Sequence, residues 1–184
     1  MKHRAVFLDR DATLVRSFPG RPANLASELE LLPGVADGIK ALHDAGLLLI
    51  CLTNQAGIAL GYMEPEEMSR MIFRLDELLI NAGSFPLKQT YWCAHAPRDL
   101  CACRKPAPGL YFQAAADLDI DLSKSYAVGD MATDMDAAVR AGICTKIMVR
   151  SDMSKDSPFA TATVGSLLEA AKIIVQMEAR CAAK

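Results

Sequence analysis

Two acidic residues follow the first apolar run of the chain. Asp9 and Asp11 come directly after Phe7-Leu8 with one residue between them, so an extended backbone would point both carboxylates the same way. Carboxylates held this close repel one another unless a cation neutralises them or one takes up a proton. A hard cation such as Mg²⁺ would keep Asp9 ionised as a nucleophile, while Asp11 could act as general acid and base. The alternative is a solvated turn, because Asp is common after strands.

A second acidic segment follows a later apolar run. Asp130 comes directly after Val128-Gly129, and Asp134 lies further on, where a helix is expected to begin. If the two strands are neighbours in a sheet, Asp9, Asp11 and Asp130 converge on one ion and leave room for water and a phosphate oxygen, which suits Mg²⁺. Asp134 is expected as a stabilising carboxylate near this site, with capping of the helix as its alternative role.

Residues that could hold phosphate occur in two further segments. Thr53 follows another apolar run, and its hydroxyl could grip phosphate oxygens together with Asn54, Gln55 and the backbone N–H groups around them. Lys105 could neutralise both a phosphoryl group and the nucleophile, while the guanidinium of Arg104 could bind a second anionic group. An ordinary turn and a pair of solvated cations are the alternatives.

Three cysteines and one histidine crowd into the segment just before these two cations. Cys93-Ala-His95 and Cys101-Ala-Cys103 supply three thiolates and one imidazole, the ligand set of a closed tetrahedral zinc site. A disulfide is the rival, but a bridge between Cys101 and Cys103 would be strained and would leave Cys93 unpaired. Four protein ligands leave no open position for water, so we expect the zinc to be structural and to hold the loop that carries the two cations.

Short apolar runs alternate with longer helical patterns, which is typical of a parallel sheet covered on both faces. The expected strands are Ala5-Leu8, Leu47-Leu52, Lys88-Trp92, Tyr126-Val128 and Thr145-Val149. The expected helices are Val35-Ala45, Pro65-Ala82, Leu110-Leu118, Thr133-Ala141 and Ser166-Arg180. We therefore predict an α/β fold: a three-layer, Rossmann-like parallel sheet with helices on both faces. Ligands of such sheets bind beyond the carboxyl ends of the strands, where the loops Arg16-Leu32 and Ala94-Gly109 are expected. Because both loops are short, no large cap domain is expected.

Length and composition exclude several classes of protein. The chain has 184 residues, and we expect residues 1–184 to form a single domain. Its longest apolar stretch, Gly46 to Leu52, is far shorter than the roughly 20 residues of a membrane span, and its N-terminus lacks the apolar segment of a secretory signal. A net charge of −2 without a basic run argues against nucleic acid as a partner. We expect a cytoplasmic monomer without a membrane partner, with Cys51 and Cys144 as inert core residues and Cys181 as a surface thiol.

The order and spacing of these motifs resemble the haloacid dehalogenase superfamily of phosphatases, across most of the chain. The segments that carry the resemblance are Asp9-Arg10-Asp11-Ala12-Thr13, Thr53-Asn54-Gln55, Cys103-Arg104-Lys105-Pro106 and Gly129-Asp130 with Asp134. The Cys/His loop and the Thr-Asn-Gln segment narrow the resemblance to the group of heptose bisphosphate and histidinol-phosphate phosphatases.

This resemblance implies a role for each matching residue. Asp9 would be the nucleophile, Asp11 the general acid and base, and Asp130 a magnesium ligand. Thr53 and Lys105 would hold the phosphate. The resemblance further implies that the backbone carbonyl of Asp11 binds the Mg²⁺.

Two residues depart from the family pattern. Ala12 stands where Gly is usual, and a left-handed backbone there would cost about 1 kcal/mol. Leu60 stands where heptose phosphatases typically carry Arg. This difference weakens the case for a heptose substrate and leaves the chemistry of phosphate removal unchanged.

An open site suits a small phosphorylated metabolite whose second polar end meets Arg104. A sugar bisphosphate fits better than histidinol phosphate, because a nearby cation would repel the amine of histidinol phosphate. We therefore favour a heptose bisphosphate as the substrate. The implied pathway is the synthesis of heptose precursors for the lipopolysaccharide core or a related product. A zinc-stabilised binding module that has lost catalysis is the alternative from another class, and Ala12 is its only support.

Overall fold

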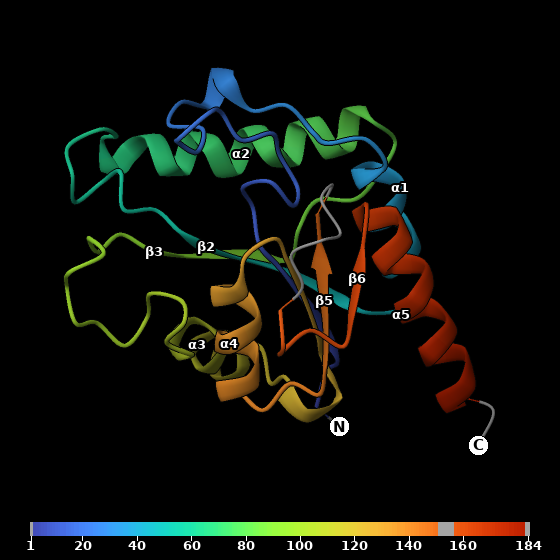
Figure 1. Ribbon diagram of the computed structural model, residues 1–184. Coiled ribbons are helices and arrows are strands. Elements are labelled where there is room, and N and C mark those ends of the chain that lie inside the picture. Colours follow the sequence, from blue (N-terminus) through green and yellow to red (C-terminus); the bar gives the residue numbers. More distant parts are fainter. Residues whose placement is uncertain (1, 151–156, 183–184) are drawn as a thin grey trace.

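Six strands form one parallel sheet in the computed structural model, which describes residues 2–150 and 157–182 (Figure 1). The strands are β1 (Ala5–Leu8), β2 (Leu48–Asn54), β3 (Gln89–Cys93), β4 (Tyr126–Gly129), β5 (Thr145–Val149) and β6 (Ala162–Val164). Their order across the sheet is β3-β2-β1-β4-β5-β6. Val6 of β1 pairs with Leu49 on one side and with Tyr126 on the other, so β1 and β4 are neighbours.

Helices cover both faces of this sheet. They are α1 (Val35–Asp44), α2 (Pro65–Asn81), α3 (Gly109–Asp117), α4 (Ala132–Arg140) and α5 (Leu167–Ala182), with short 3-10 turns at Ala26–Glu28 and Leu122–Lys124. Helices α1, α2 and α5 share one core cluster with Val6 and Leu8, whereas α3 and α4 share the other with Phe7 and Ile50. Alternate residues of β1 therefore reach opposite layers, and the predicted three-layer α/β fold is confirmed. Among the described residues, no helix is both long and apolar enough to cross a bilayer.

The carboxyl edge of the sheet is where the site must lie. From β1 the chain adds β2 and β3 on one side and then β4, β5 and β6 on the other. Such a reversal of strand order opens a crevice beyond the carboxyl ends of the two strands on either side of it. The loops 9–34 and 94–108, which follow β1 and β3, lie at this edge, and no large cap domain occurs in the part of the chain that the structure describes.

The sequence-based elements need three corrections. Strands β2 and β3 run on to Asn54 and Cys93, so the Thr-Asn pair and the first cysteine of the cluster belong to strands. Strand β6 was not predicted, because three residues at a sheet edge give too short a pattern. The placement of Cys144 in the core is wrong: its side chain is exposed, because Cys144 lies at a bend just before β5 and not in the buried strand itself.

Candidate active site

A cavity of about 690 Å³ opens at the carboxyl edge of the sheet. It is lined by the predicted site residues Asp9, Asp11, Thr53, Asn54, Arg104, Lys105, Asp130 and Asp134, and by Ser17, Phe18, Gly20, Arg21, Pro22, Met131 and Thr133. Residues from four separate segments therefore meet in one place, because all strands of a parallel sheet end at the same edge. Gln55 is buried and is not part of the described lining.

Lys105 lies at the floor of this cavity and joins three elements. Its Nζ is 2.5 Å from Asp9 Oδ1 and 2.6 Å from Asp134 Oδ1, and it donates to the carbonyl oxygen of Leu52 at 2.7 Å. Asn54 holds the backbone of Lys105 on both sides: its Oδ1 accepts from the Lys105 N–H at 3.0 Å, and its Nδ2 donates to the Lys105 carbonyl at 3.1 Å. The side chain of Asn54, predicted as a phosphate holder, thus anchors the residue that carries the ammonium group.

Burial determines how these groups ionise. It raises the pKa of Asp9 to about 8; Lys105 opposes this shift, while Asp134 adds to it. Burial and then Asp134 raise the pKa of Asp130 to about 6. For Lys105, burial disfavours the charge, but Asp134 and Asp9 outweigh it and raise the pKa of the ammonium. The carboxyl groups of Asp9 and Asp130 therefore need a further cation to be fully ionised near neutral pH.

Three carboxylates are close enough to share an ion. Oxygens of Asp9, Asp130 and Asp134 all lie within 4.8 Å of one another. Asp134 is already engaged, because its Oδ1 contacts Lys105 and its Oδ2 accepts the N–H of Met131 at 2.9 Å. Asp9 and Asp130 are therefore the carboxylates most available to a cation. Hard oxygen ligands with raised pKa values fit Mg²⁺, since a divalent cation relieves the repulsion between them.

These pKa shifts predict a pH-dependent response to Mg²⁺. A carboxyl group whose pKa is raised on folding stabilises the metal-free fold fully below its ordinary pKa of 3.8, and this contribution is lost as the pH rises from there through the folded-state pKa, about 6 for Asp130 and about 8 for Asp9. Mg²⁺ binds the ionised groups, so its stabilising effect should grow over the same window. We expect the rise in Tm between EDTA-treated and Mg²⁺-loaded protein to be several degrees larger at about pH 8 than at about pH 5. An equal rise at both pH values, at matched ionic strength, would contradict this assignment.

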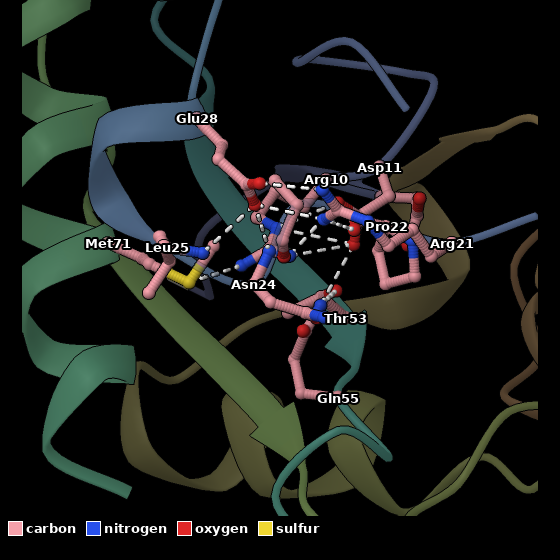
Figure 2. Close-up of polar contacts among 12 residues, drawn as sticks. Arg10, Asp11, Arg21, Pro22, Asn24, Leu25, Glu28, Thr53, Gln55 and Met71 are labelled. Atoms are coloured by element: carbon pink, nitrogen blue, oxygen red, sulfur yellow. Dashed lines mark hydrogen bonds and ion pairs between the residues drawn. The ribbon is translucent and has the colours of Figure 1, made fainter. Parts of the chain in front are cut away.

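The carboxylate of Asp11 does not join this group, although it lines the same cavity. Its two oxygens accept hydrogen bonds from Nη2 of Arg10 at 2.9 and 3.0 Å, and Oδ2 also accepts from Nε2 of Gln55 at 2.8 Å (Figure 2). The sequence predicts that the side chains of Asp9, Asp11 and Asp130 converge on one ion. In the structure the third carboxylate beside Asp9 and Asp130 is that of Asp134 and not that of Asp11.

The backbone turns sharply after Asp11, and Ala12 has a φ of +59°. This is the left-handed conformation predicted for a position that is usually Gly, and it brings the side chain of an L-residue close to its own carbonyl oxygen. We expect Ala12→Gly to stabilise the protein by about 0.5–1 kcal/mol, because relief of strain exceeds the entropy that glycine adds to the unfolded chain. Urea titration of the two proteins measures this difference. A destabilised Ala12→Gly protein would show that the turn is not strained.

The Cys/His cluster is assembled as its spacing predicted. The Sγ atom of Cys103 lies 3.1 Å from that of Cys93 and 3.6 Å from that of Cys101, and His95 Nδ1 lies 3.4 Å from Cys93 Sγ and 3.2 Å from Cys103 Sγ. The three cysteines form no disulfide, and the ligand atoms of all four residues lie within 4.8 Å of one another. Metal–sulfur bonds of about 2.3 Å in a tetrahedron give ligand separations of about 3.8 Å, so the cluster fits a zinc ion.

Two charged residues of this region, Arg10 and Arg21, were not predicted as site residues. Arg10 has an exposed fraction of 1%, and a buried arginine requires an anionic partner, which here is Asp11. Arg21 lines the cavity and is paired with Glu28 at 2.6 Å. Arg10 lies between the two motif aspartates, and this neighbourhood is the one signal that could have identified it. Leu60, the second departure from the family pattern, is exposed and lies outside the described lining of the cavity.

The chain is similar to several known proteins in sequence and in fold. A family model described as HAD-hydrolase-like matches residues 102–170. The D-glycero-beta-D-manno-heptose-1,7-bisphosphate 7-phosphatase of Haemophilus ducreyi is 38% identical over 157 residues, which cover 82% of this chain and 85% of that protein. The protein of the same name from Helicobacter pylori is 32% identical over 153 residues, covering 83% and 87%. The crystal structure of the D,D-heptose 1,7-bisphosphate phosphatase from B. bronchiseptica, complexed with magnesium and phosphate, has a TM-score of 0.85 at 29% identity and covers 95% of this chain and 99% of that one.

The fold, the site and these similarities together define the class of protein. The chain belongs to the haloacid dehalogenase-like (HAD-like) superfamily, as the sequence motifs predicted. It is an enzyme of the phosphatase class within that superfamily.

Proposed function

We propose that this phosphatase removes the 7-phosphate of D-glycero-D-manno-heptose 1,7-bisphosphate through an aspartyl-phosphate on Asp9, with Mg²⁺ as its catalytic cofactor. The observation that carries the proposal is the floor of the cavity, where Asp9 lies 2.5 Å from the ammonium of Lys105, with Thr53 and Arg104 in the same lining. The substrate class is supported by relatives of that name at 32–38% identity. The structural neighbour with bound magnesium and phosphate supports the choice of ion.

In the first half of the reaction, a carboxylate oxygen of Asp9 attacks the phosphorus atom and the bond from phosphorus to the sugar oxygen breaks. The hydroxyl of Thr53 donates to a phosphoryl oxygen, and the nearby ammonium of Lys105 offsets the charge of the phosphoryl group. The leaving oxygen takes a proton from the carboxyl group of Asp11. When bound, Mg²⁺ supplies positive charge that keeps Asp9 ionised and polarises the phosphoryl group.

In the second half, the carboxylate of Asp11 takes a proton from a water molecule. The oxygen of that water attacks the phosphorus, and the bond to Asp9 breaks to release inorganic phosphate. Asp9 and Asp11 are thereby returned to their starting protonation states. Because burial raises the pKa of Asp9 to about 8, this carboxyl group is mostly protonated near neutral pH until a further cation binds beside it.

Arg104 is the residue that we expect to select a bisphosphate. It lines the cavity, and its Nη1 is 3.4 Å from the carbonyl oxygen of His95, so the Cys/His loop helps to orient it. A guanidinium can bind a second phosphate through two parallel hydrogen bonds, whereas it repels the ammonium of histidinol phosphate.

A direct comparison of the two substrates tests this proposal. Purified protein is assayed for phosphate release from heptose 1,7-bisphosphate and from histidinol phosphate, with Mg²⁺ or with EDTA. We expect kcat/KM to favour the bisphosphate by about 10²-fold or more, and activity to be lost in EDTA. A preference for histidinol phosphate would overturn the substrate assignment. Absence of phosphate release from either substrate would favour the binding-module alternative.

We further propose that the ion in the Cys93, His95, Cys101 and Cys103 cluster is a structural Zn²⁺. Two observations support this choice: four soft or borderline ligand atoms form a closed set, and the segment they enclose leads directly to Arg104 and Lys105. Such an ion would order a loop that contributes few apolar side chains to the core.

Removal of one ligand tests the zinc site. We expect Cys103→Ser protein to lose about one equivalent of bound zinc, to unfold at a Tm several degrees lower, and to show a KM raised by about 10-fold because Arg104 is no longer held. Metal analysis, thermal melts and steady-state kinetics measure these effects. Cys144→Ser, which alters an exposed cysteine outside the cluster, is the matched control and should match the wild type. Equal zinc content in the two variants would refute the site.

A further inference from the structure

Arg10 and Gln55 form a buried polar layer next to the cavity, and neither residue lines it in the described structure. Both have an exposed fraction of 1%. Burying a guanidinium and an amide costs free energy unless every polar atom finds a partner. The contacts that these two side chains make therefore indicate their purpose.

The guanidinium of Arg10 is held on several sides (Figure 2). Its Nε and Nη2 atoms donate to both carboxylate oxygens of Asp11, at 2.9–3.2 Å. Nη2 also donates to the carbonyl oxygen of Ala23 at 3.1 Å, and Nη1 lies 3.5 Å from Sδ of Met71 on α2. A planar donor group fixed to a loop and to a helix can hold a carboxylate in a single orientation.

The amide of Gln55 connects two site residues. Its Nε2 donates to Asp11 Oδ2 at 2.8 Å and to Thr53 Oγ1 at 2.7 Å. Toward the ionised form of Asp11, which is the base of the second half of the reaction, the amide presents its NH₂ group, and its two hydrogens serve the two contacts. Thr53 Oγ1 accepts one of these hydrogens, so the proton of its own hydroxyl is left to be donated elsewhere. Gln55 thereby makes Thr53 a donor toward the phosphoryl oxygens in the cavity.

We infer that Arg10 and Gln55 are positioning residues for the reaction: Arg10 orients the acid–base carboxylate of Asp11, and Gln55 aligns Asp11 with the phosphate-binding hydroxyl of Thr53. This inference rests on the proposed function, since it assigns both residues to the same reaction. It changes the role expected for Gln55, from a direct phosphate holder to a residue that acts through two others.

The two roles predict different kinetic defects. A misplaced Asp11 slows only the transfer that needs a protonated leaving group, such as transfer from a sugar phosphate. p-Nitrophenyl phosphate releases a stable anion, so its first phosphoryl transfer needs no acid. A misdirected Thr53 hydroxyl weakens binding of any phosphate, so it raises KM for both substrates.

Rapid-quench first-turnover rates on the two substrates test this inference. For Arg10→Lys, which keeps the charge and loses the two-pronged contact, we expect a rate lower by about 30-fold with heptose 1,7-bisphosphate and by less than about 3-fold with p-nitrophenyl phosphate, at unchanged KM. For Gln55→Met we expect the same selectivity together with a KM raised by about 5-fold for both substrates. The matched controls are Arg140→Lys, where an exposed guanidinium also donates to an aspartate through Nε and Nη2, and Gln113→Met, from an exposed glutamine; both should behave as wild type.

Four outcomes would count against the inference or against the function on which it rests. Equal losses on both substrates, with no change in KM, would mean that Arg10 and Gln55 only support the fold, and would overturn the inference; thermal melts of each variant report that loss of structure directly. Wild-type rates in both variants would also overturn it. Asp11→Asn separates the two levels: if it shows the selective defect while the Arg10 and Gln55 variants do not, the proposed function stands and only the positioning role fails. If Asp11→Asn shows no defect, the proposed function itself fails.

Discussion

Replacing Asp9 by Asn is expected to lower kcat by at least about 10⁴-fold while leaving the protein folded, because the variant removes the nucleophile and changes almost nothing in shape. The carboxylate oxygen of Asp9 nearest the ammonium of Lys105 can be replaced by the amide oxygen of Asn, which still accepts that hydrogen bond. Loss of activity should therefore occur without loss of packing.

The same substitution is expected to affect stability in the opposite sense: activity falls, whereas the Tm of the metal-free protein does not. Burial raises the pKa of Asp9 to about 8, so the ionised carboxylate is unfavourable in the metal-free fold at neutral pH. A neutral Asn avoids this cost, and we expect the metal-free Asp9→Asn protein to have a Tm equal to or above that of the wild type, with a smaller gain on adding Mg²⁺. Phosphate release and thermal melts measure the two effects. An active Asp9→Asn protein would refute the covalent route, and a large fall in Tm would show that Asp9 mainly supports the structure.

The second large effect is expected for Lys105→Met, because the ammonium of Lys105 is shared by two carboxylates and a carbonyl oxygen. Its loss leaves Asp9 and Asp134 buried without their cation, and breaking such a buried pair costs about 3–5 kcal/mol. The phosphoryl group also loses its charged partner, so we expect kcat/KM to fall by about 10³-fold.

Lys40→Met provides the matched control for Lys105→Met. Lys40 forms an exposed pair with Asp44 at 3.1 Å, and exposed pairs contribute between zero and about 1 kcal/mol. Urea unfolding and steady-state kinetics distinguish the two variants. If Lys105→Met were as stable and as active as Lys40→Met, the floor of the cavity would not be the centre of the reaction.

The convergence of Asp9 and Asp130 could be predicted from the sequence. Each directly follows a short apolar run, and parallel strands place such positions at one edge of the sheet. The β1–β4 pairing that brings them together was left open as a condition, because strand order depends on contacts between distant segments. The Cys/His cluster was also predictable, since its spacing alone limits what four such ligands can do.

Side-chain directions beyond the strand ends could not be predicted in the same way. The alternation rule that points Asp9 and Asp11 the same way holds only for extended backbone, and the left-handed Ala12 shows that the chain turns directly after Asp11. Asp11 therefore meets Arg10 and Gln55, while Asp134 takes the place beside Asp9. A buried arginine is equally hard to foresee, because its burial depends on partners supplied by separate segments.

Detection of phosphate on Asp9 shows directly whether the reaction passes through an aspartyl-phosphate. Asp11→Asn protein with Mg²⁺ is mixed with p-nitrophenyl phosphate, whose leaving group needs no acid, quenched in acid and digested with pepsin at low pH. Because release of the phosphate needs the base that this variant lacks, we expect a mass increase of about 80 Da, that of one phosphoryl group, on the peptide that contains Asp9. The increase should be absent when Asp9 is also replaced by Asn. Phosphate on another residue, or nitrophenolate released in the first turnover without any phosphorylated peptide, would rule out Asp9 as the nucleophile.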